Sequence, residues 1–237
     1  IVMADNGRPF PRCKTRVYDS GMKTPLIISW PGGLRQKGVF THSLVSAVDL
    51  APTILEIAGV PVPSSYQGIS FVPILQNPTA EIRNVVYSEH NWHDYEAYER
   101  MARTKDFLYV YNGRPSLSDG GPADSKKSAT QAALNRLRDQ GRLTPAQADI
   151  FITPRPSEEL FAVTDDPGQF LNLASVPAYQ PELEAMRRLL LNWQLDTRDT
   201  MPESLTPDWY DRETGDPLKK EQLRGTMPGY VPQKNCL

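Results

Sequence analysis

Three polar residues near the start of the chain are of types that could bind a cation and an oxyanion together. Asp5 and Asn6 follow a short apolar run, and Lys14 comes nine residues after Asp5. Carboxylate and carboxamide oxygens are hard ligands that suit Ca²⁺ or Mg²⁺. A lysine ammonium beside the metal could hold a tetrahedral oxyanion. The alternative is an Asp-Asn-Gly surface turn followed by a solvated lysine, and on spacing alone this turn is the commoner case.

A second polar group is the segment 89–94, in which His90 and His93 flank Trp92. The two histidines could belong to a zinc site, but no third strong ligand of that kind lies nearby in the sequence. The segment could instead be a substrate-binding loop in which His93 and Trp92 face a sugar. A plain loop that Trp92 packs is the remaining alternative.

Basic residues gather before the apolar run 107–111, at Arg100, Arg103 and Lys105. A solvated face is the default interpretation of this cluster, and binding of an anionic substrate is the alternative. Cys13 has basic neighbours, which favour a thiolate, but it lacks an obvious base, so we do not expect it to be a nucleophile. The sequence contains no Ser-His-Asp arrangement and no phosphate-binding Gly-rich loop.

The elements that must position these residues are of mixed α/β type. Short apolar runs that end at turn residues predict strands at 1–4, 25–30, 85–88, 107–111 and 158–163. Helical spacing of apolar residues predicts helices at 50–58, in two short stretches of 129–151, and at 181–195. Asp49 is the expected N-cap of the first helix, and Gly59 is its expected end. Residues 113–128, rich in Gly, Ser and Pro, are expected to form an exposed loop.

Length and composition are those of a globular protein. The chain has 237 residues, of which 39% are hydrophobic and 23% charged, and this suffices for a sizeable core. The net charge of −2 argues against nucleic acid as a partner. No apolar run approaches 18 residues, so no transmembrane segment is expected. Cys13 and Cys236 cannot form a disulfide framework by themselves. Because the run 1–4 predicts a buried strand with partners on both sides, we expect the chain to be the C-terminal part of a longer protein.

Four stretches, in this order along the chain, carry a resemblance to a known family. They are MADNG at 3–7, KTRVYDSGMKTPLIISWP at 14–31, VDLAPTILEIAG at 48–59 and ELFAVTDDPGQFLNLA at 159–174. These stretches resemble motifs of the sulfatase family, within the alkaline-phosphatase-like superfamily. The string NGRPFPR, which begins at Asn6, and the helix end at 191–199 resemble sulfamidase-like (heparan N-sulfatase-like) members in particular.

The resemblance implies a fold and a division of the chain. The fold class is α/β, the C-terminal part of an alkaline-phosphatase-like sulfatase fold, plus a smaller antiparallel-sheet subdomain with a packed C-terminal helix. Residues 1–80 would complete the catalytic α/β domain, and residues 81–200 would form the smaller α+β subdomain. Residues 201–237 would be a Pro-rich extended tail that wraps the surface or is partly disordered. The family is mostly periplasmic, secreted or lysosomal, so one of these locations is expected.

The resemblance also implies a chemistry. In the family the nucleophile is a formylglycine, made from Cys or Ser in a C/S-x-P-x-R motif. One Ca²⁺ ion, held by two early aspartates and a later Asp-Asn pair, neutralises the sulfate oxygens. Asp5 and Asn6 match the later pair of Ca²⁺ ligands, and Lys14 matches the basic residue that contacts the sulfate.

This chain also departs from the family pattern. It lacks the C/S-x-P-x-R motif and the early aspartates, so these are expected in a missing N-terminal half, and the segment alone is expected to be inactive. The expected function is Ca²⁺-dependent hydrolysis of a sulfate ester or sulfamate, with a sulfated sugar as substrate. His93 and Arg103 are predicted substrate contacts, because the expected loop 88–105 follows a strand and is rich in polar tips. The alternatives are a phosphoester hydrolase of the same superfamily and a non-catalytic glycan-binding relative.

Overall fold

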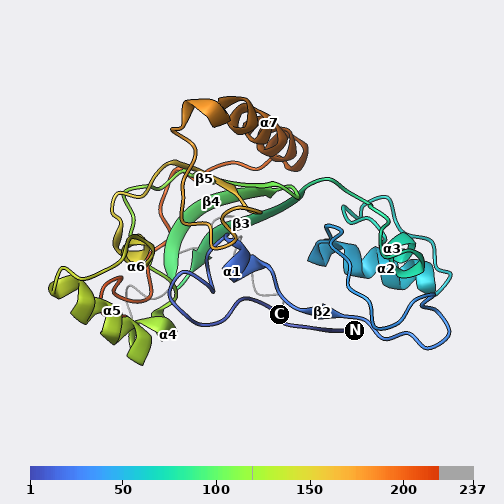
Figure 1. The fold of residues 1–237 in the computed structure, drawn as a ribbon, viewed down its shortest axis with the longest axis horizontal. Helices are drawn as coiled ribbons and strands as arrows, with labels where there is room; N and C mark the ends of the chain where they lie inside the picture. The colour runs from blue at the N-terminus through green and yellow to red at the C-terminus, as the bar shows by residue number, and fades with distance from the viewer. Residues whose placement is uncertain (119, 219–237) are drawn as a thin grey trace, which may run out of the picture.

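The computed structural model describes residues 1–118 and 120–218, and its centre is a four-stranded antiparallel sheet (Figure 1). The strands lie in the order β3 (Val86–His93), β4 (Tyr95–Arg103), β5 (Phe107–Asn112) and β6 (Glu158–Ala162). A second sheet contains only two short antiparallel strands, β1 (Val2–Met3) and β2 (Leu26–Ile27). The architecture is therefore mixed, with an antiparallel sheet where the sequence predicts one.

The four-stranded sheet has a helix on each of its faces and further helices around it. The α-helices of the described ranges are α1 (Asp19–Met22), α2 (Leu50–Ile57), α3 (Val72–Gln76), α4 (Ala123–Lys126), α5 (Ala129–Asp139), α6 (Pro145–Ala148) and α7 (Gln180–Thr197). Short 3₁₀ turns lie at Ala47–Asp49, Asp149–Phe151 and Pro177–Tyr179. Figure 1 shows α7 over one face of the sheet and α1 under the other, with α2 and α3 in a lobe beside it. Within the described ranges, no helix is both long enough and apolar enough to cross a membrane.

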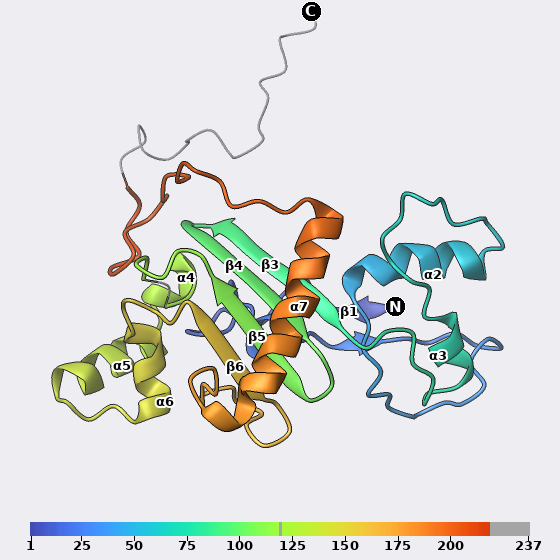
Figure 2. The same cartoon turned by 90° about the horizontal axis from the view of Figure 1, so that it is seen from above.

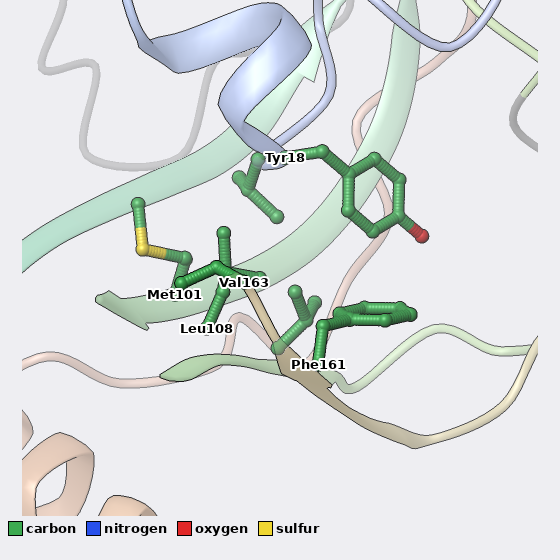
Figure 3. Packing of buried hydrophobic residues seen from close by; sticks show 7 residues of the cluster. Tyr18, Met101, Leu108, Phe161 and Val163 are labelled. Carbon is green, nitrogen blue, oxygen red and sulfur yellow. The ribbon is translucent and has the colours of Figure 1, made fainter. Parts of the chain in front are cut away.

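Apolar side chains of the strands alternate between two cores, one on each face of the sheet. On the α1 face the buried residues are Val17, Tyr18, Met101, Leu108, Val110, Phe161 and Val163 (Figure 3). On the α7 face they are Ala102, Tyr109, Leu160, Leu173, Leu183, Met186 and Leu190. The Tyr18 ring lies edge-on to Phe161 with 5.9 Å between the ring centroids. The segment around residue 18 is therefore fixed to the sheet.

The helix α7 confirms the prediction of an amphipathic helix over 181–195. Its Leu183 and Met186 side chains are buried against the sheet, and Figure 2 shows the helix running across the strands. Trp193 stacks on Tyr87 of β3, with 5.3 Å between the ring centroids. The expected antiparallel sheet with a packed C-terminal helix is therefore confirmed.

The lobe of α2 and α3 depends on a buried aspartate. Asp49 lies at the N-cap of α2 as predicted, but its side chain does not cap the helix, because the carboxylate accepts hydrogen bonds from the amides of Ser46 and Ile69, both at 2.8 Å. The same carboxylate pairs with Arg83 and is fully buried. Asp49 thus ties α2 to later parts of the lobe, and Gly59 ends the helix at φ 68° as predicted.

The strand β4 is absent from the sequence prediction. A loop over 88–105 is wrong, because β3 and β4 form a hairpin there. The hairpin was hidden by charged residues that are buried in β4. Glu99 pairs with Arg16 at 2.9 Å, and Arg100 pairs with Asp199 at 2.7 Å. An interior strand whose charges are paired internally has the composition of a loop.

The two strands of the small sheet are shorter and more exposed than predicted. Strands were expected over 1–4 and 25–30, and each has two residues. Among the described residues β1 pairs with β2 alone, and Val2 is 66% exposed and Ile27 61%. The expectation of a buried strand with partners on both sides is therefore wrong for the part of the chain that is described.

The segment before α5 is more buried than its composition suggests. The prediction of an exposed loop over 113–128 is wrong at residues 120–123, which are buried where α4 begins. The two short helices expected within 129–151 are confirmed as α5 and α6. Thr144 caps α6 by accepting the Gln147 amide, which matches the expected start at Thr-Pro.

The chain after α7 wraps the end of the β3–β4 hairpin. The Trp209 amide donates to the Asp94 carbonyl at 2.8 Å, and Asp208 accepts from the Glu96 amide at 2.8 Å. The surface tail predicted over 201–237 stays a prediction, and its part over 219–237, with Cys236, lies outside the described residues. The divisions at residues 80 and 200 stay predictions.

Candidate functional site

The loop between β1 and α1 returns to its own start. The Lys14 amide donates to the Arg8 carbonyl at 3.0 Å, and the Gly7 amide donates to the Gly21 carbonyl at 2.9 Å. A side chain at Gly7 would collide with the backbone of the opposite stretch, since its Cβ would lie 2.7 Å from the Gly21 Cα. Lys14 is thereby brought back to Arg8, two residues after Asn6.

A chain of contacts connects Lys14 to the end of the β3–β4 hairpin. The Lys14 ammonium lies 2.9 Å from the Asp124 carboxylate. The neighbouring Ala123 amide donates to the Asp94 carboxylate at 3.0 Å. Asp94 in turn lies 3.3 Å from Nδ1 of His93. The structure therefore brings together two of the predicted site residues, Lys14 and His93, through Asp124 and Asp94.

The electrostatics of this cluster favour a protonated His93. The interaction with the Asp94 carboxylate raises the pKa of His93 above 6.5, and this outweighs the opposing effects of burial and of the Lys14 charge. Burial opposes ionisation of Asp94, but the ion pair with His93 and the hydrogen bond from the Ala123 amide outweigh it, so the pKa of Asp94 is lowered. His93 is half-exposed, and its raised pKa favours the charged form of the ring near the Lys14 ammonium.

The turn that carries His93 is held in place by the chain after α7. Asp94 has a left-handed φ of 64°, which a tight hairpin turn requires. Its carbonyl accepts the Trp209 amide at 2.8 Å. The Trp209 ring lies edge-on to Trp92, with 4.5 Å between centroids. The turn beside His93 is therefore held by contacts of Trp209 with Asp94 on one side and with Trp92 on the other.

Asp5 and Asn6 are exposed and supply only part of a cation site. The Asp5 carboxylate has no hydrogen bond or ion pair with any described residue, and the Asn6 side-chain nitrogen donates to the Gly7 carbonyl at 3.0 Å, which leaves its oxygen free. Two side-chain oxygens of this kind fit a hard cation, although Ca²⁺ takes six to eight oxygens. Further ligands would have to come from outside the described residues, since those contain no group of three or more His, Cys, Asp or Glu that could hold a metal.

Comparison with known proteins identifies the family. Residues 13–108 match the family described as "N-sulphoglucosamine sulphohydrolase, C-terminal". Over 204 residues the chain is 35% identical to an ulvan-active sulfatase of Formosa agariphila, covering 84% of this chain and 34% of that protein. The chain belongs to the sulfatase family. This sulfatase-family chain is also 30% identical over 221 residues to human N-sulphoglucosamine sulphohydrolase, covering 88% of this chain and 43% of the relative.

Solved structures bear out the sulfatase fold. A 2-O GAG sulfatase matches with a TM-score of 0.57 and 25% identity, over 83% of this chain and 36% of that one. A protein solved with its substrate D-glucosamine-2-N,6-O-disulfate has the same fold, with a TM-score of 0.55 and 23% identity over 78% of this chain and 31% of its own. This sulfatase-family chain therefore spans less than half, between 31% and 43%, of the length of the relatives and structures named above.

The sulfatase-family chain holds Arg103 far from His93. Arg103 pairs with Val86 at one end of the β3–β4 hairpin and His93 pairs with Tyr95 at the other, so seven residues, roughly 23 Å, separate them along β3. The guanidinium forms two contacts with Asp19, at 3.1 and 3.2 Å. The prediction of one substrate loop that carries both residues is therefore wrong.

Arg103 instead lines a cavity of about 480 Å³ on the far side of the Lys14 loop. Cys13, Lys23 and Phe170 also line this cavity. Cys13 is a half-buried free thiol. Its neighbour along the chain is Lys14, so the cavity adjoins the cluster around Lys14.

The other polar candidates of the sulfatase-family chain are engaged in structural contacts. Nδ1 of His90 lies 3.4 Å from the Glu99 carboxylate inside the sheet. Arg100 is buried beside Asp199, so the interpretation as a solvated face is wrong for it. Lys105 pairs with an exposed glutamate. Nothing in the described ranges supports the zinc alternative.

Sequence reasoning missed Asp94 and Asp124. Asp94 directly follows His93, but the charged residues of the next strand, β4, hid the hairpin turn on which Asp94 lies. Asp124 has no signal in the sequence, since it meets Lys14 across 110 positions of the chain. Its place at the site could be found only from the fold.

Proposed function

We propose that this chain is part of an enzyme that hydrolyses sulfate esters or sulfamates of sulfated sugars. The observation that carries the proposal is the meeting of Lys14 and His93, which come from distant parts of the chain, with Lys14 on the loop that follows the Asp5–Asn6 turn. The ulvan-active sulfatase and the N-sulphoglucosamine sulphohydrolase among the relatives support a sulfated sugar as the substrate class. Because the chain spans less than half of either relative, the activity is proposed for the whole protein that contains it.

Asp5 and Asn6 would supply two oxygens to a Ca²⁺ ion, with the remaining ligands and a formylglycine nucleophile outside this chain. When bound, Ca²⁺ would neutralise charge on the sulfate oxygens. The free Asp5 carboxylate and the free Asn6 oxygen support this assignment. In such an enzyme the 237-residue chain alone would release no sulfate from an aryl sulfate.

Lys14 would hold a sulfate oxygen. Its ammonium has three donors and spends one on Asp124, so it can bind the substrate without breaking that ion pair. A compact lysine charge here also favours a sulfatase over a two-metal phosphoester hydrolase, which would tend to place its second metal ion at this position.

His93 would bind the sugar or one of its anionic groups. Asp94 raises the pKa of the ring and so favours its protonated form, in which both ring nitrogens carry hydrogens and Nε2 would donate to the substrate. Arg103 would contact a more distant sugar, since the cavity that it lines adjoins Lys14 through Cys13. A substrate that reached both residues would be an oligosaccharide.

The test is sulfate release from sulfated di- and oligosaccharides by the full-length protein, with and without Ca²⁺. Removal of Ca²⁺ by a chelator is expected to abolish turnover, and added Ca²⁺ is expected to restore it. Asp5→Ala should weaken the apparent Ca²⁺ affinity about tenfold or more, because a charged ligand is lost. Asp165→Ala, at an exposed turn aspartate away from the site, is the matched control and should change nothing.

Two results would redirect the assignment. Release of phosphate rather than sulfate from matched esters would identify the phosphoester hydrolase. Tight binding of a sulfated glycan with no turnover, in a protein that holds Ca²⁺, would identify the non-catalytic relative.

A further inference from the structure

We propose that Arg12 and Arg16 are positioning residues that hold Lys14 in place, by joining the two sides of its loop to the four-stranded sheet and its connecting loops. The inference rests on the proposed function, because Lys14 is the sulfate-binding residue there. The two arginines stand two positions before and two positions after Lys14.

Arg16 joins the loop to the centre of the sheet. Its side chain is 1% exposed and lies 2.9 Å from the carboxylate of Glu99, which is 3% exposed and belongs to the interior strand β4. Taking two charges out of water costs free energy that a buried pair often fails to recover, and apolar side chains of similar volume are often as stable. The stability of the fold therefore does not account for the Arg16–Glu99 pair. A need to hold the Lys14 loop in one position does account for it.

Arg12 joins the other side of the loop to the segments that flank β6. Its guanidinium contacts Asp149 at 2.7 Å and the Gly168 carbonyl at 2.9 Å, and it also donates to the Gln169 carbonyl. The same group lies over the Tyr18 ring, 3.9 Å from its centroid. These partners in three directions fix the planar guanidinium in one position, whereas a flexible lysine ammonium would not be fixed in this way.

The backbone between the two arginines is in an unfavourable conformation. Arg12 has φ 63° and Thr15 has φ 70°. Positive φ is a genuine outlier for a β-branched residue such as Thr15, and such conformations persist only where the surroundings determine them. The Arg16 amide donates to the Cys13 carbonyl at 3.0 Å, which closes the turn around Lys14. Local sequence therefore does not fix this turn, and the two buried arginines do.

The core below the loop supports the same assignment. Tyr18 is fully buried on the α1 face of the sheet, above Phe161 (Figure 3). Its hydroxyl donates to Glu159 at 2.7 Å and accepts from Arg155 at 2.7 Å. The chain just after Arg16 is thus anchored to the sheet, so movement of the Lys14 loop must involve the stretch between Arg12 and Arg16.

The test compares two neutralised carboxylates in the full-length protein. Glu99→Gln removes the charge that faces Arg16. Asp199→Asn is the matched control, because Asp199 pairs with the buried Arg100 at 2.7 Å on the next residue of the same strand and has no contact with the Lys14 loop. The readouts are amide hydrogen exchange over residues 8–18, and kcat and KM for sulfate release.

Glu99→Gln is expected to raise exchange over residues 8–18 about tenfold, and Asp199→Asn is expected to leave that exchange unchanged. Displacement of Lys14 by about 1 Å should lower kcat about 10²-fold. The change in KM should stay within about threefold, because the interaction is made mainly in the transition state. A purely structural role would lower the amount of folded enzyme in both variants and would not produce this split.

Equal exchange over residues 8–18 in the wild type and in Glu99→Gln would overturn the proposal, as would equal losses of kcat in the two variants. If Glu99→Gln does not fold, Arg12→Lys serves instead, since lysine keeps the charge but cannot reach three partners at once. Exchange needs no turnover, so it decides the positioning role even where the wild type releases no sulfate. A wild-type protein that releases no sulfate would overturn the proposed function alone, and the positioning role of the two arginines would still be decided by the exchange data.

Discussion

Replacement of Lys14 by methionine separates the contribution of this lysine to stability from its contribution to catalysis. The Lys14 ammonium lies 2.9 Å from the Asp124 carboxylate, and the two side chains are 21% and 51% exposed. Ion pairs this accessible to water contribute about 0–1 kcal/mol. Methionine keeps the apolar stem of lysine. We therefore expect Lys14→Met to lower the free energy of unfolding by less than about 1 kcal/mol.

The loss of catalysis is expected to be larger. In the proposed function Lys14 donates to sulfate oxygens that gain charge in the transition state. Removal of one such donor costs about 10²–10³ in kcat, or about 2.7–4 kcal/mol. The assays are sulfate release by the full-length protein and urea unfolding followed by tryptophan fluorescence. Lys127→Met is the control, because Lys127 pairs with Asp216 at 2.8 Å in an exposed contact that involves neither Lys14 nor Asp124.

Two outcomes would refute this reasoning. A kcat within about threefold of the wild type would remove Lys14 from the transition state. A loss of more than about 2 kcal/mol in unfolding free energy would mean that the pair with Asp124 is structural, and that lower activity follows from less folded enzyme. The control should change neither quantity.

Three further outcomes are expected. Asp94→Asn should lower the pKa of His93 toward its ordinary value, measured by NMR titration of the ring, and an unchanged pKa would contradict the assignment. Since the wild-type pKa is raised, the stabilisation of the fold by this pair is present below pH 6.5 and is lost as the pH rises through the raised value. His93→Ala should raise KM for a sulfated glycan far more than for a small aryl ester, and equal effects would argue against a substrate contact. Leu183→Ala, at a side chain 1% exposed, should cost about 3 kcal/mol in unfolding experiments; Leu191→Ala, 53% exposed on the same helix, should cost less than about 0.5 kcal/mol, and similar losses would mean that α7 does not pack as described.

The elements found from the sequence are those whose apolar pattern matches their burial. The helix over 181–195 presents one apolar face to the sheet, and the strand over 107–111 is rich in aromatic and branched residues. The strand β4 was missed for the opposite reason. Glu99 and Arg100 read as solvent-facing, yet both are buried beside partners from distant parts of the chain. The periodicity of apolar residues shows which residues are polar, but it does not show that a charged residue is paired inside the fold.

The candidate site divides in the same way. Asp5, Asn6 and Lys14 were found because a local string carries their chemistry. The contact of Lys14 with Asp124 was not predictable, since it depends on α4 lying against the loop. The grouping of Arg103 with His93 failed because the predicted loop is a long hairpin, which places residues near in sequence at opposite ends.

The segment after α7 determines when the candidate site can be completed during synthesis. All four strands of the larger sheet are available once residue 162 has been made. The turn that carries His93 receives its last contact from Trp209, almost fifty residues later. Because chains emerge from the ribosome in order, a nascent chain can form the sheet while the His93 end is still open. A nascent chain arrested after α7 but before Trp209 would have the sheet and both of its cores, while the turn that carries His93 would still lack its last contact.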